Sequence, residues 1–283
     1  MTPTAPLVSA DWLARHLDDQ AIAVLDGRWY LPNQGHDTAA EYTAGHIAGA
    51  PWFDIDAIAD GVNPLPHMLP DGAQFAKQVE RLGIGDESHV IAYDSGSGMA
   101  AARIWWMMRV FGHDRVSVLD GGLKAWATAG QTLVAGPVTP PSRNFTPRFR
   151  PALVRDRAAM LANCRDRRAQ VADARSAGRY YGVAPEPRPG LRGGHMPGSR
   201  ALPFNTLMAE DGCFLPGDKI AARFADSGID LARPLITTCG TGVTAAVLAL
   251  GAAIAGQTDV AVYDGSWAEW GASDDTPIVL VTG

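Results

Sequence analysis

Two stretches of the chain, HVIAYDSGSGMAA (residues 89–101) and RPLITTCGTGVTAA (residues 233–246), follow one pattern. Each begins with a short apolar run, which is typical of a buried strand. A glycine-rich turn follows, and an alanine-containing segment with helical character comes after it. Asp94 and Cys239 occupy the same point of the pattern, 145 positions apart. The pattern predicts two copies of a strand–loop–helix unit.

Three further phrases repeat in the same order and with similar offsets. They are DGGLKAW (120–126) with DGSWAEW (264–270), GHIAG (45–49) with GHMPG (194–198), and VLDGR (24–28) with VADAR (171–175). Four ordered matches are hard to obtain by chance. We therefore interpret the chain as a tandem duplication rather than as two unrelated domains that share turn chemistry.

A proline-rich stretch separates the two copies. It contains Pro137, Pro140, Pro141, Pro147 and Pro151. Proline fixes φ and lacks an amide proton, so neither a helix nor a central strand is expected there. We predict a first domain over residues 1–135, an extended linker over 136–151 and a second domain over 152–283.

Strand and helix patterns alternate within each copy. We expect strands at 89–94, 115–120, 234–239 and 260–264, and helices at 99–111, 123–129, 244–255 and 267–271. This alternation predicts an α/β fold in which each domain is a parallel sheet with helices on both faces. Ligands of such folds bind at the carboxyl ends of the strands, where Asp94 and Cys239 are expected.

Composition excludes several classes of protein. The 283 residues carry 24 Lys and Arg against 30 Asp and Glu, and the net charge of −6 argues against a nucleic-acid binder. A hydrophobic fraction of 47% excludes intrinsic disorder as the main state. Three cysteines cannot all be paired, so no disulfide framework is expected. The N-terminal residues do not resemble a signal peptide and no apolar run is long enough for a bilayer, so we expect a cytoplasmic protein without a membrane partner.

The segment from Thr238 to Thr244 concentrates the chemistry. Gly240 and Gly242 permit positive φ, so consecutive backbone N–H groups can converge on one anion. The start of the following helix adds partial positive charge, and Thr244 is a suitable helix cap. A thiol at Cys239 is therefore expected to ionise readily to the nucleophilic thiolate.

Two thiolate chemistries use such a loop. Phosphoryl transfer requires an arginine six residues after the cysteine, and Ala245 occupies that position. Sulfur transfer requires only backbone amides that stabilise a persulfide anion. The sequence favours sulfur transfer. It contains no Cys/His spacing suited to zinc and no dinucleotide-binding fingerprint, so neither a metal nor an organic cofactor is expected.

The chain resembles the tandem-domain rhodanese-like sulfurtransferases of the 3-mercaptopyruvate type along its whole length. The loop Cys-Gly-Thr-Gly-Val-Thr (239–244) is similar to theirs, whereas thiosulfate sulfurtransferases usually carry basic residues in its second and third places. Other matching phrases are FDID (53–56), HMLP (67–70), DGG (120–122), PEPR (185–188) and DGSW (264–267). The family's first domain lacks the nucleophile, which agrees with Asp94.

The resemblance implies roles for individual residues. Cys239 is the nucleophile, and the loop residues that stabilise its persulfide are Gly240, Thr241, Gly242, Val243 and Thr244. Arg179 and Arg188 bind the 2-oxo acid donor, whose carboxylate suits a planar guanidinium. Asp56, His67 and Thr241 form a relay. Cys164 and Cys213 are interpreted as bystanders.

The implied reaction moves sulfur from 3-mercaptopyruvate to cyanide, a small thiol or a thioredoxin-like protein, and it releases pyruvate. Two alternatives remain open. The first is a thiosulfate:cyanide sulfurtransferase on the same fold. The second is a persulfide carrier without enzymatic turnover.

Overall fold

The computed structural model describes residues 4–31 and 34–280. The chain divides into two compact units. Unit 1 comprises Met1–Gly61, Leu69–Arg150 and Ala209–Phe214, and unit 2 comprises Val62–Met68, Pro151–Met208 and Leu215–Gly283. The main division lies between Arg150 and Pro151, at the end of the proline-rich stretch. Each unit also includes one short segment from the other half of the sequence.

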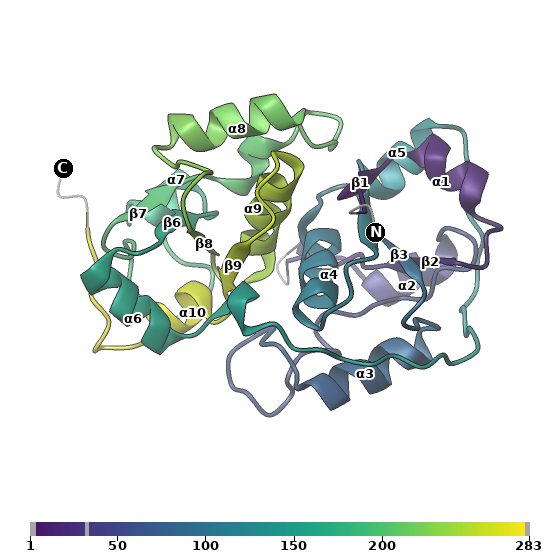
Figure 1. The fold of residues 1–283 in the computed structure, drawn as a ribbon, viewed down its shortest axis with the longest axis horizontal. Helices are drawn as coiled ribbons and strands as arrows, with labels where there is room; N and C mark the ends of the chain where they lie inside the picture. Colours follow the sequence, from purple (N-terminus) through teal and green to yellow (C-terminus); the bar gives the residue numbers. More distant parts are fainter. Residues whose placement is uncertain (1–3, 32–33, 281–283) are drawn as a thin grey trace. The chain divides into compact units, whose positions relative to one another are not determined.

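Unit 1 contains a parallel sheet in the order β1-β4-β3-β2. Its strands are β1 (Leu7–Val8), β2 (Ile22–Asp26), β3 (His89–Tyr93) and β4 (Val116–Leu119). Its helices are α1 (Ala10–His16), α2 (Thr38–Ala44), α3 (Gly72–Arg81), α4 (Met99–Val110) and α5 (Gly122–Thr128). Figure 1 shows these elements in purple to blue and teal. The strands and helices expected at residues 89–129 are confirmed.

Alternate residues of β3 pack against different layers of helices. Ile91 and Tyr93 join one apolar cluster with Leu13 of α1 and Trp126 of α5. Successive residues of a strand point to opposite faces, so Val90 and the other intervening residues face the side on which α4 contacts β3 and β4. The sheet is therefore covered on both faces, as expected for parallel strands that are apolar throughout.

Unit 2 repeats this arrangement with the strand order β5-β9-β8-β6-β7, and all its pairs are parallel. Its strands are β5 (Val154–Arg155), β6 (Gln170–Asp173), β7 (Ser199–Ala201), β8 (Leu235–Thr238) and β9 (Val260–Tyr263). Its α-helices are α6 (Arg157–Asp166), α7 (Ala177–Tyr180), α8 (Gly217–Asp226), α9 (Val243–Ile254) and α10 (Ser266–Trp270). Short 3-10 helices lie at Pro151–Leu153 and Phe204–Leu207.

The two faces of the second sheet are also covered. Met160 of α6 and Trp267 of α10 pack on Ile236 of β8. Helix α9 contacts β8 and β9 and is itself contacted by α8, and Figure 1 shows α8 and α9 together, away from α6 and α10. The α/β fold expected for both copies is confirmed.

Helices α4 and α9 are largely buried, and α9 packs between its sheet and α8. Eleven of the twelve residues of α9 are Val, Leu, Ile, Ala or Gly, and ten of the twelve are buried. Both helices are twelve residues long. Among the described residues, no helix combines the length and the apolar character needed to cross a bilayer.

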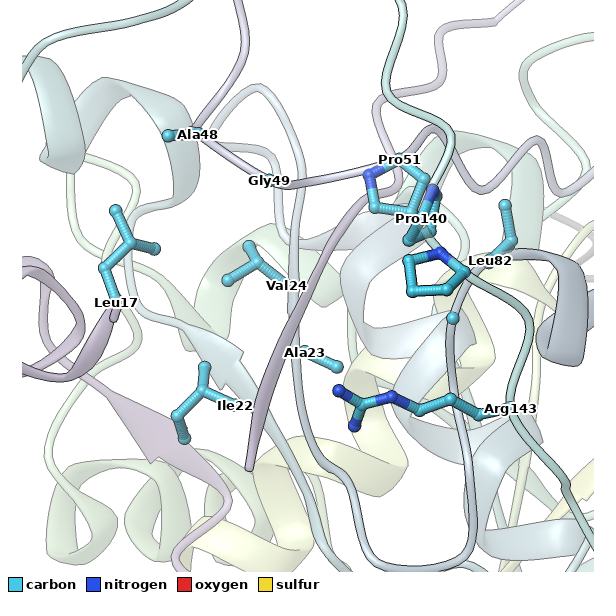
Figure 2. Close-up of a pocket in the computed structure, with 12 residues that line it drawn as sticks. Leu17, Ile22, Ala23, Val24, Ala48, Gly49, Pro51, Leu82, Pro140 and Arg143 are labelled. Carbon is cyan, nitrogen blue, oxygen red and sulfur yellow. The ribbon is translucent and has the colours of Figure 1, made fainter. Parts of the chain in front are cut away.

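Residues 137–150 form neither helix nor strand, and they pack on unit 1. The ring of Phe145 meets Phe75 edge-on, and the amides of Arg148 and Arg150 donate to carbonyls at the end of α4 and just after it. Pro140, Pro141 and Arg143 line a cavity of about 130 Å³ beside β2. Figure 2 shows this cavity between the strand and the proline-rich stretch. Its lining residues include none of the candidate site residues.

Candidate active site

Cys239 directly follows β8 and precedes the short loop Gly240–Gly242. The residue is buried, with 2% of its surface exposed. Its amide donates a hydrogen bond to Oγ of Ser266 at 3.1 Å, and its carbonyl accepts one from the amide of Trp267 at 2.9 Å. These two bonds join the end of β8 to the start of α10. They hold the thiol at the carboxyl end of the sheet.

The hydroxyl group of Ser266 lies beside the thiol. Its Oγ lies 4.0 Å from Sγ of Cys239 and 2.7 Å from the carbonyl of Tyr263. A hydroxyl has one proton, and the shorter contact takes it, so the contact with sulfur is not a second donated bond. Ser266 has a φ of 47°, which is uncommon for a residue other than glycine. The residue is therefore held in place to support the end of β8.

The glycine-rich loop carries the chain from Cys239 to the N-terminus of α9. Gly242 has a φ of 80° and precedes the helix, so the expected positive φ is confirmed there. Gly240 does not adopt positive φ, and that part of the prediction is wrong. Thr244 is also not the helix cap, because α9 already begins at Val243. The positive end of the helix dipole still faces the thiol side of the loop.

The corresponding loop of unit 1 surrounds a carboxylate. Asp94 accepts hydrogen bonds from the amides of Gly96, Gly98, Ala100 and Ala101 at 2.9, 3.0, 3.2 and 3.3 Å. The residue is 1% exposed. The amide of Leu123 donates to the Asp94 carbonyl as that of Trp267 donates to the Cys239 carbonyl. A loop of this construction therefore does enclose an anion with backbone amides.

Arg179 lies against the loop that follows Cys239. A β-carbon on Gly240 would be 3.0 Å from Nη2 of Arg179, so the guanidinium is in close contact with the bare backbone. The side chain of Arg179 is 24% exposed. The glycine at position 240 thus gives Arg179 room beside the nucleophile, and this is a different reason for a glycine from the one expected.

Glu186 connects Arg179 to a buried ion pair. Its Oε2 accepts from Nε and Nη2 of Arg179 at 3.1 and 2.5 Å, and its Oε1 accepts from Nη1 of Arg175 at 2.8 Å. Arg175 also forms a two-point contact with Asp173, and its guanidinium lies 3.9 Å from the ring centroid of Trp267. Burial alone would lower the pKa of Arg175, but the two carboxylates raise it above the usual value.

Arg188 lies two residues beyond Glu186 and is half-buried. In the described part of the chain it makes no hydrogen bond or ion pair. The two arginines expected to bind the donor therefore differ. Arg179 is held by a carboxylate next to the nucleophile's loop, whereas the donors of Arg188 are available to a ligand.

His67 and Thr241 are brought together across a long sequence separation. Nδ1 of His67 lies 2.9 Å from Oγ1 of Thr241, and both residues are 7% exposed. His67 belongs to the segment Val62–Met68, which is part of unit 2. The residue adopts a φ of 60°, a left-handed conformation that histidine tolerates better than most side chains. An imidazole and a hydroxyl thus form a hydrogen-bonded pair in the nucleophile's loop.

Asp56, the third member expected in this relay, belongs to unit 1. Its Oδ2 accepts a hydrogen bond from Nε1 of Trp29 at 3.0 Å. The pair formed by His67 and Thr241 is therefore present within unit 2, and the participation of Asp56 stays a prediction.

The other two cysteines lie in surroundings that disfavour ionisation. Burial raises the pKa of Cys164. Burial raises the pKa of Cys213 to about 11, with further contributions from Asp120 and Asp211. Both are expected to remain thiols at neutral pH and to be poor nucleophiles. Over the described residues, no group of three or more His, Cys, Asp or Glu side chains is placed to hold a metal ion.

Two residues of this site received no role from the sequence. Ser266 replaces Gly122 of the first copy, and this difference inside a repeated phrase is the signal that identifies it. Glu186 lies in a stretch that the first copy lacks. Such a carboxylate looks like any exposed loop residue until its two arginine partners are located.

These features define a duplicated α/β protein whose second copy presents a buried cysteine in a glycine-rich loop beside a helix start. The model of the rhodanese-like domain matches residues 9–129 and 156–273, once in each copy. The chain belongs to the rhodanese-like family.

Individual relatives refine this assignment. The human 3-mercaptopyruvate sulfurtransferase is 43% identical over 270 residues, covering 93% of this chain and 91% of the relative. A mitochondrial thiosulfate/3-mercaptopyruvate sulfurtransferase of Arabidopsis thaliana is 39% identical, covering 99% and 80%. The crystal structure of SseA from Escherichia coli, described as a 3-mercaptopyruvate sulfotransferase, superposes with a TM-score of 0.86 at 40% identity and covers 93% of this chain and 99% of that one. The resemblance to the 3-mercaptopyruvate type is confirmed.

Proposed function

We propose that this protein is a 3-mercaptopyruvate sulfurtransferase that carries the transferred sulfur as a persulfide on Cys239. The observation that supports this most directly is the loop itself. It joins a buried thiol to the N-terminus of α9, with Arg179 against one side and the pair of His67 and Thr241 hydrogen-bonded within it.

Asp94 gives independent support for a persulfide. A carboxylate extends two heavy atoms beyond Cβ and carries a negative charge, and so does a cysteine persulfide. The amides of Ala100 and Ala101 that bind Asp94 correspond, at the starts of the matched helices, to those of Thr244 and Ala245. We infer that these two amides, together with the amides of the loop, bind the outer sulfur.

The donor has a carboxylate and a keto oxygen at one end and a thiol at the other. Arg188 is available for a two-point contact with the carboxylate, because its donors are not taken by described residues. Arg179 lies against the nucleophile's loop, and we assign it to the keto oxygen. The two contacts fix the donor's sulfur in front of Cys239.

The first half-reaction forms an S–S bond and breaks a C–S bond. The Cys239 thiolate attacks the donor's sulfur, and the electron pair of the C–S bond moves to carbon, giving the enolate of pyruvate. A proton delivered to that carbon completes pyruvate, and the proton of the donor's thiol, which stays on the outer sulfur during the attack, is then released as the persulfide anion forms. Thr241 supplies this proton and recovers one from His67, with Asp56 as the expected final member of the relay.

In the second half-reaction a nucleophile attacks the outer sulfur, and the Cys239 thiolate leaves. Cyanide, a small thiol or a thioredoxin-like protein would serve as acceptor. All three cysteines are unpaired in this structure, which suits a reducing compartment, and we propose a cytoplasmic location.

A thiosulfate:cyanide sulfurtransferase is the second candidate, because the Arabidopsis relative is named for both donors. Kinetics with 3-mercaptopyruvate and thiosulfate side by side distinguish the two. We expect kcat/KM to be higher for 3-mercaptopyruvate, because the loop offers no lysine or arginine at positions 240 and 241. A preference for thiosulfate would contradict the proposal. A stoichiometric persulfide without turnover would identify a carrier instead.

The nucleophile is tested separately. Donor without acceptor should add one sulfur atom to the protein, and peptide mass spectrometry should locate it on Cys239. The Cys239→Ser variant should lose both the adduct and turnover. Location of the adduct on Cys164 or Cys213 would refute the assignment.

A further inference from the structure

Glu186 is a buried carboxylate that bonds to two arginines at once, and its side chain is 2% exposed. One oxygen bonds to Arg175 and the other to both Nε and Nη2 of Arg179. From this geometry we infer that Glu186 is the positioning residue for Arg179, which it holds against the loop of Cys239. The inference deepens the proposed function, because it rests on Arg179 contacting the donor.

The first copy shows which of these contacts the fold needs. Arg28 binds Asp26 through Nε and Nη2 and the carbonyl of Gly45 through Nη2, at 3.1, 2.6 and 2.7 Å. Arg175 binds Asp173 and the carbonyl of Gly194 in the same way, at 3.1, 2.7 and 2.9 Å.

Among the described residues, Arg28 nevertheless makes no bond that matches the one between Nη1 of Arg175 and Glu186. It lines an open hollow of about 520 Å³ instead. The buried pair of arginine and aspartate is therefore complete without a second carboxylate. The additional contact between Arg175 and Glu186 in unit 2 is thus not needed for the fold, and we look for its role in a feature that unit 1 lacks.

An inserted stretch supplies that additional carboxylate. Tyr42 and Tyr180 are equivalent, because each stacks on a histidine whose Nδ1 contacts the tyrosine's own carbonyl. His46 lies four positions after Tyr42 and His195 lies fifteen positions after Tyr180, so the second copy carries eleven additional residues here. Glu186 lies within them.

The residue before each tyrosine also differs. It is Glu41 in the first copy and Arg179 in the second. Glu41 accepts hydrogen bonds from Tyr30 and His36, and it has no counterpart of the contact between Arg179 and Glu186. Unit 2 thus combines Cys239, Arg179 and Glu186, whereas the first copy has Asp94 and Glu41 at the positions of the first two and lacks the stretch that contains the third.

The contact limits how Arg179 can meet a ligand. Nε and one hydrogen of Nη2 face Glu186, so Nη1 and the second hydrogen of Nη2 are left to donate toward a donor molecule. An arginine side chain has several rotatable bonds, and fixing them costs conformational entropy. Without a partner that holds it, the side chain of Arg179 would leave the loop at little cost in free energy. Glu186 selects the one orientation in which the guanidinium lies over Gly240.

The test is a double-mutant cycle on the full-length protein. Arg179→Ala and Glu186→Gln should each lower kcat/KM for 3-mercaptopyruvate about tenfold or more, and the double variant should match Arg179→Ala within about twofold. If the double variant loses activity by the product of the two single losses, the inference is overturned, because Glu186 would then act through a group other than Arg179. The inference would also be overturned if Glu186→Gln kept its activity while Arg179→Ala lost it.

A second measurement does not depend on turnover. The ratio of the alkylation rates of Cys239 with iodoacetate and iodoacetamide reports positive charge near the thiol. Removal of a carboxylate raises this ratio if Arg179 stays in place, and release of Arg179 lowers it. We expect Glu186→Gln to lower the ratio about threefold or more, and a rise would overturn the inference. This result stands even if 3-mercaptopyruvate is not the donor.

Two variants serve as controls. Asp114→Asn breaks a two-point contact with Arg150 in unit 1, with distances of 2.6 and 2.7 Å, and should leave both readouts unchanged. Glu186→Asp keeps the charge but is too short to reach both arginines, so its effect should have the same direction as that of Glu186→Gln. If Glu186→Gln does not fold, Glu186→Asp carries the same test and the same contrary outcomes.

Discussion

Asp94 and Cys239 occupy equivalent positions, because the carbonyl of each accepts a hydrogen bond from the second residue of the helix that follows the next strand. The donors are the amides of Leu123 and Trp267, at 2.8 and 2.9 Å. The two side chains nevertheless meet their loops differently. The carboxylate of Asp94 already accepts hydrogen bonds from four amides at the end of its strand, so these amides are not available to an external anion.

Asp94 should accordingly contribute to stability and not to turnover. Asp94→Ala removes the acceptor of four amides, three of them buried, and a buried donor left without a partner costs about 1–3 kcal/mol. Thermal or urea unfolding should show a loss of at least this size, and Asp94→Asn should lose less. Folded Asp94→Ala should keep its kcat/KM. A stability equal to that of the parent would contradict the role assigned to these bonds.

Gly240→Ala should impair donor binding without unfolding the protein. The added methyl would lie 3.0 Å from Nη2 of Arg179, so the guanidinium must move away from the loop. We expect kcat/KM for 3-mercaptopyruvate to fall about tenfold, the size of one weakened charge-assisted contact. Gly61→Ala, where nothing lies within 4 Å of the new carbon, is the matched control. Equal activity of the two variants would show that Arg179 tolerates the shift.

Thr241→Val tests the hydroxyl that contacts His67. Valine keeps the shape of threonine but cannot exchange a proton with the imidazole. General acid catalysis contributes about 10²–10⁴-fold, so kcat should fall about a hundredfold or more with little change in KM. Thr241→Ser keeps the hydroxyl and should remain active. Wild-type kcat in the valine variant would remove the relay from the mechanism.

Thr241→Lys tests how the loop chooses its donor. A cation next to Cys239 should favour the thiosulfate dianion. The gain in thiosulfate turnover could approach a hundredfold, because one charge-assisted contact contributes about 1.5–3 kcal/mol. Turnover of 3-mercaptopyruvate should fall in the same variant. If the variant keeps an intact loop and its thiosulfate turnover equals that of the parent, the charge of the loop does not set the donor specificity.

The pH dependence of labelling should separate Cys213 from the nucleophile. The pKa of Cys213 is raised to about 11, so its thiolate fraction grows about tenfold for each pH unit below that value. Alkylation of Cys213 should therefore be very slow at pH 7 and should accelerate steeply up to about pH 11. Mass spectrometry of alkylated peptides measures this directly. Fast labelling of Cys213 at pH 7 would contradict its assignment as a bystander.

The repeated phrases were sufficient to predict the fold, because strand and helix patterns are local and occur twice. The nearly constant offset, however, concealed two compensating changes of length. The first copy has additional residues between Arg28 and Tyr42. The second copy has eleven additional residues between Tyr180 and His195. The loops differ too, because three residues separate Cys239 from α9 whereas four separate Asp94 from α4.

The site was predictable only where chemistry is encoded locally. Cys239 is recognisable because its glycines and its helix start adjoin it in sequence. The contact of His67 with Thr241 spans 174 positions, and only the resemblance to a family predicted it. Glu186 and Ser266 act through tertiary contacts with Arg179 and with the end of β8. Their phrases, PEPR (185–188) and DGSW (264–267), are recognisable in the sequence, but the partners of the two side chains are not.

The exchange of short segments between the two halves has a consequence for how the chain can be divided. The first half supplies Val62–Met68, with the imidazole, to the unit that holds the thiol, and the second supplies Ala209–Phe214 in return. Within unit 1, this returned segment accepts a bond from Lys124 and donates one to Asp120. A protein divided at Pro151 would lack a piece in both fragments. The copy without a cysteine therefore cannot be deleted without removing His67 from the unit that holds Cys239.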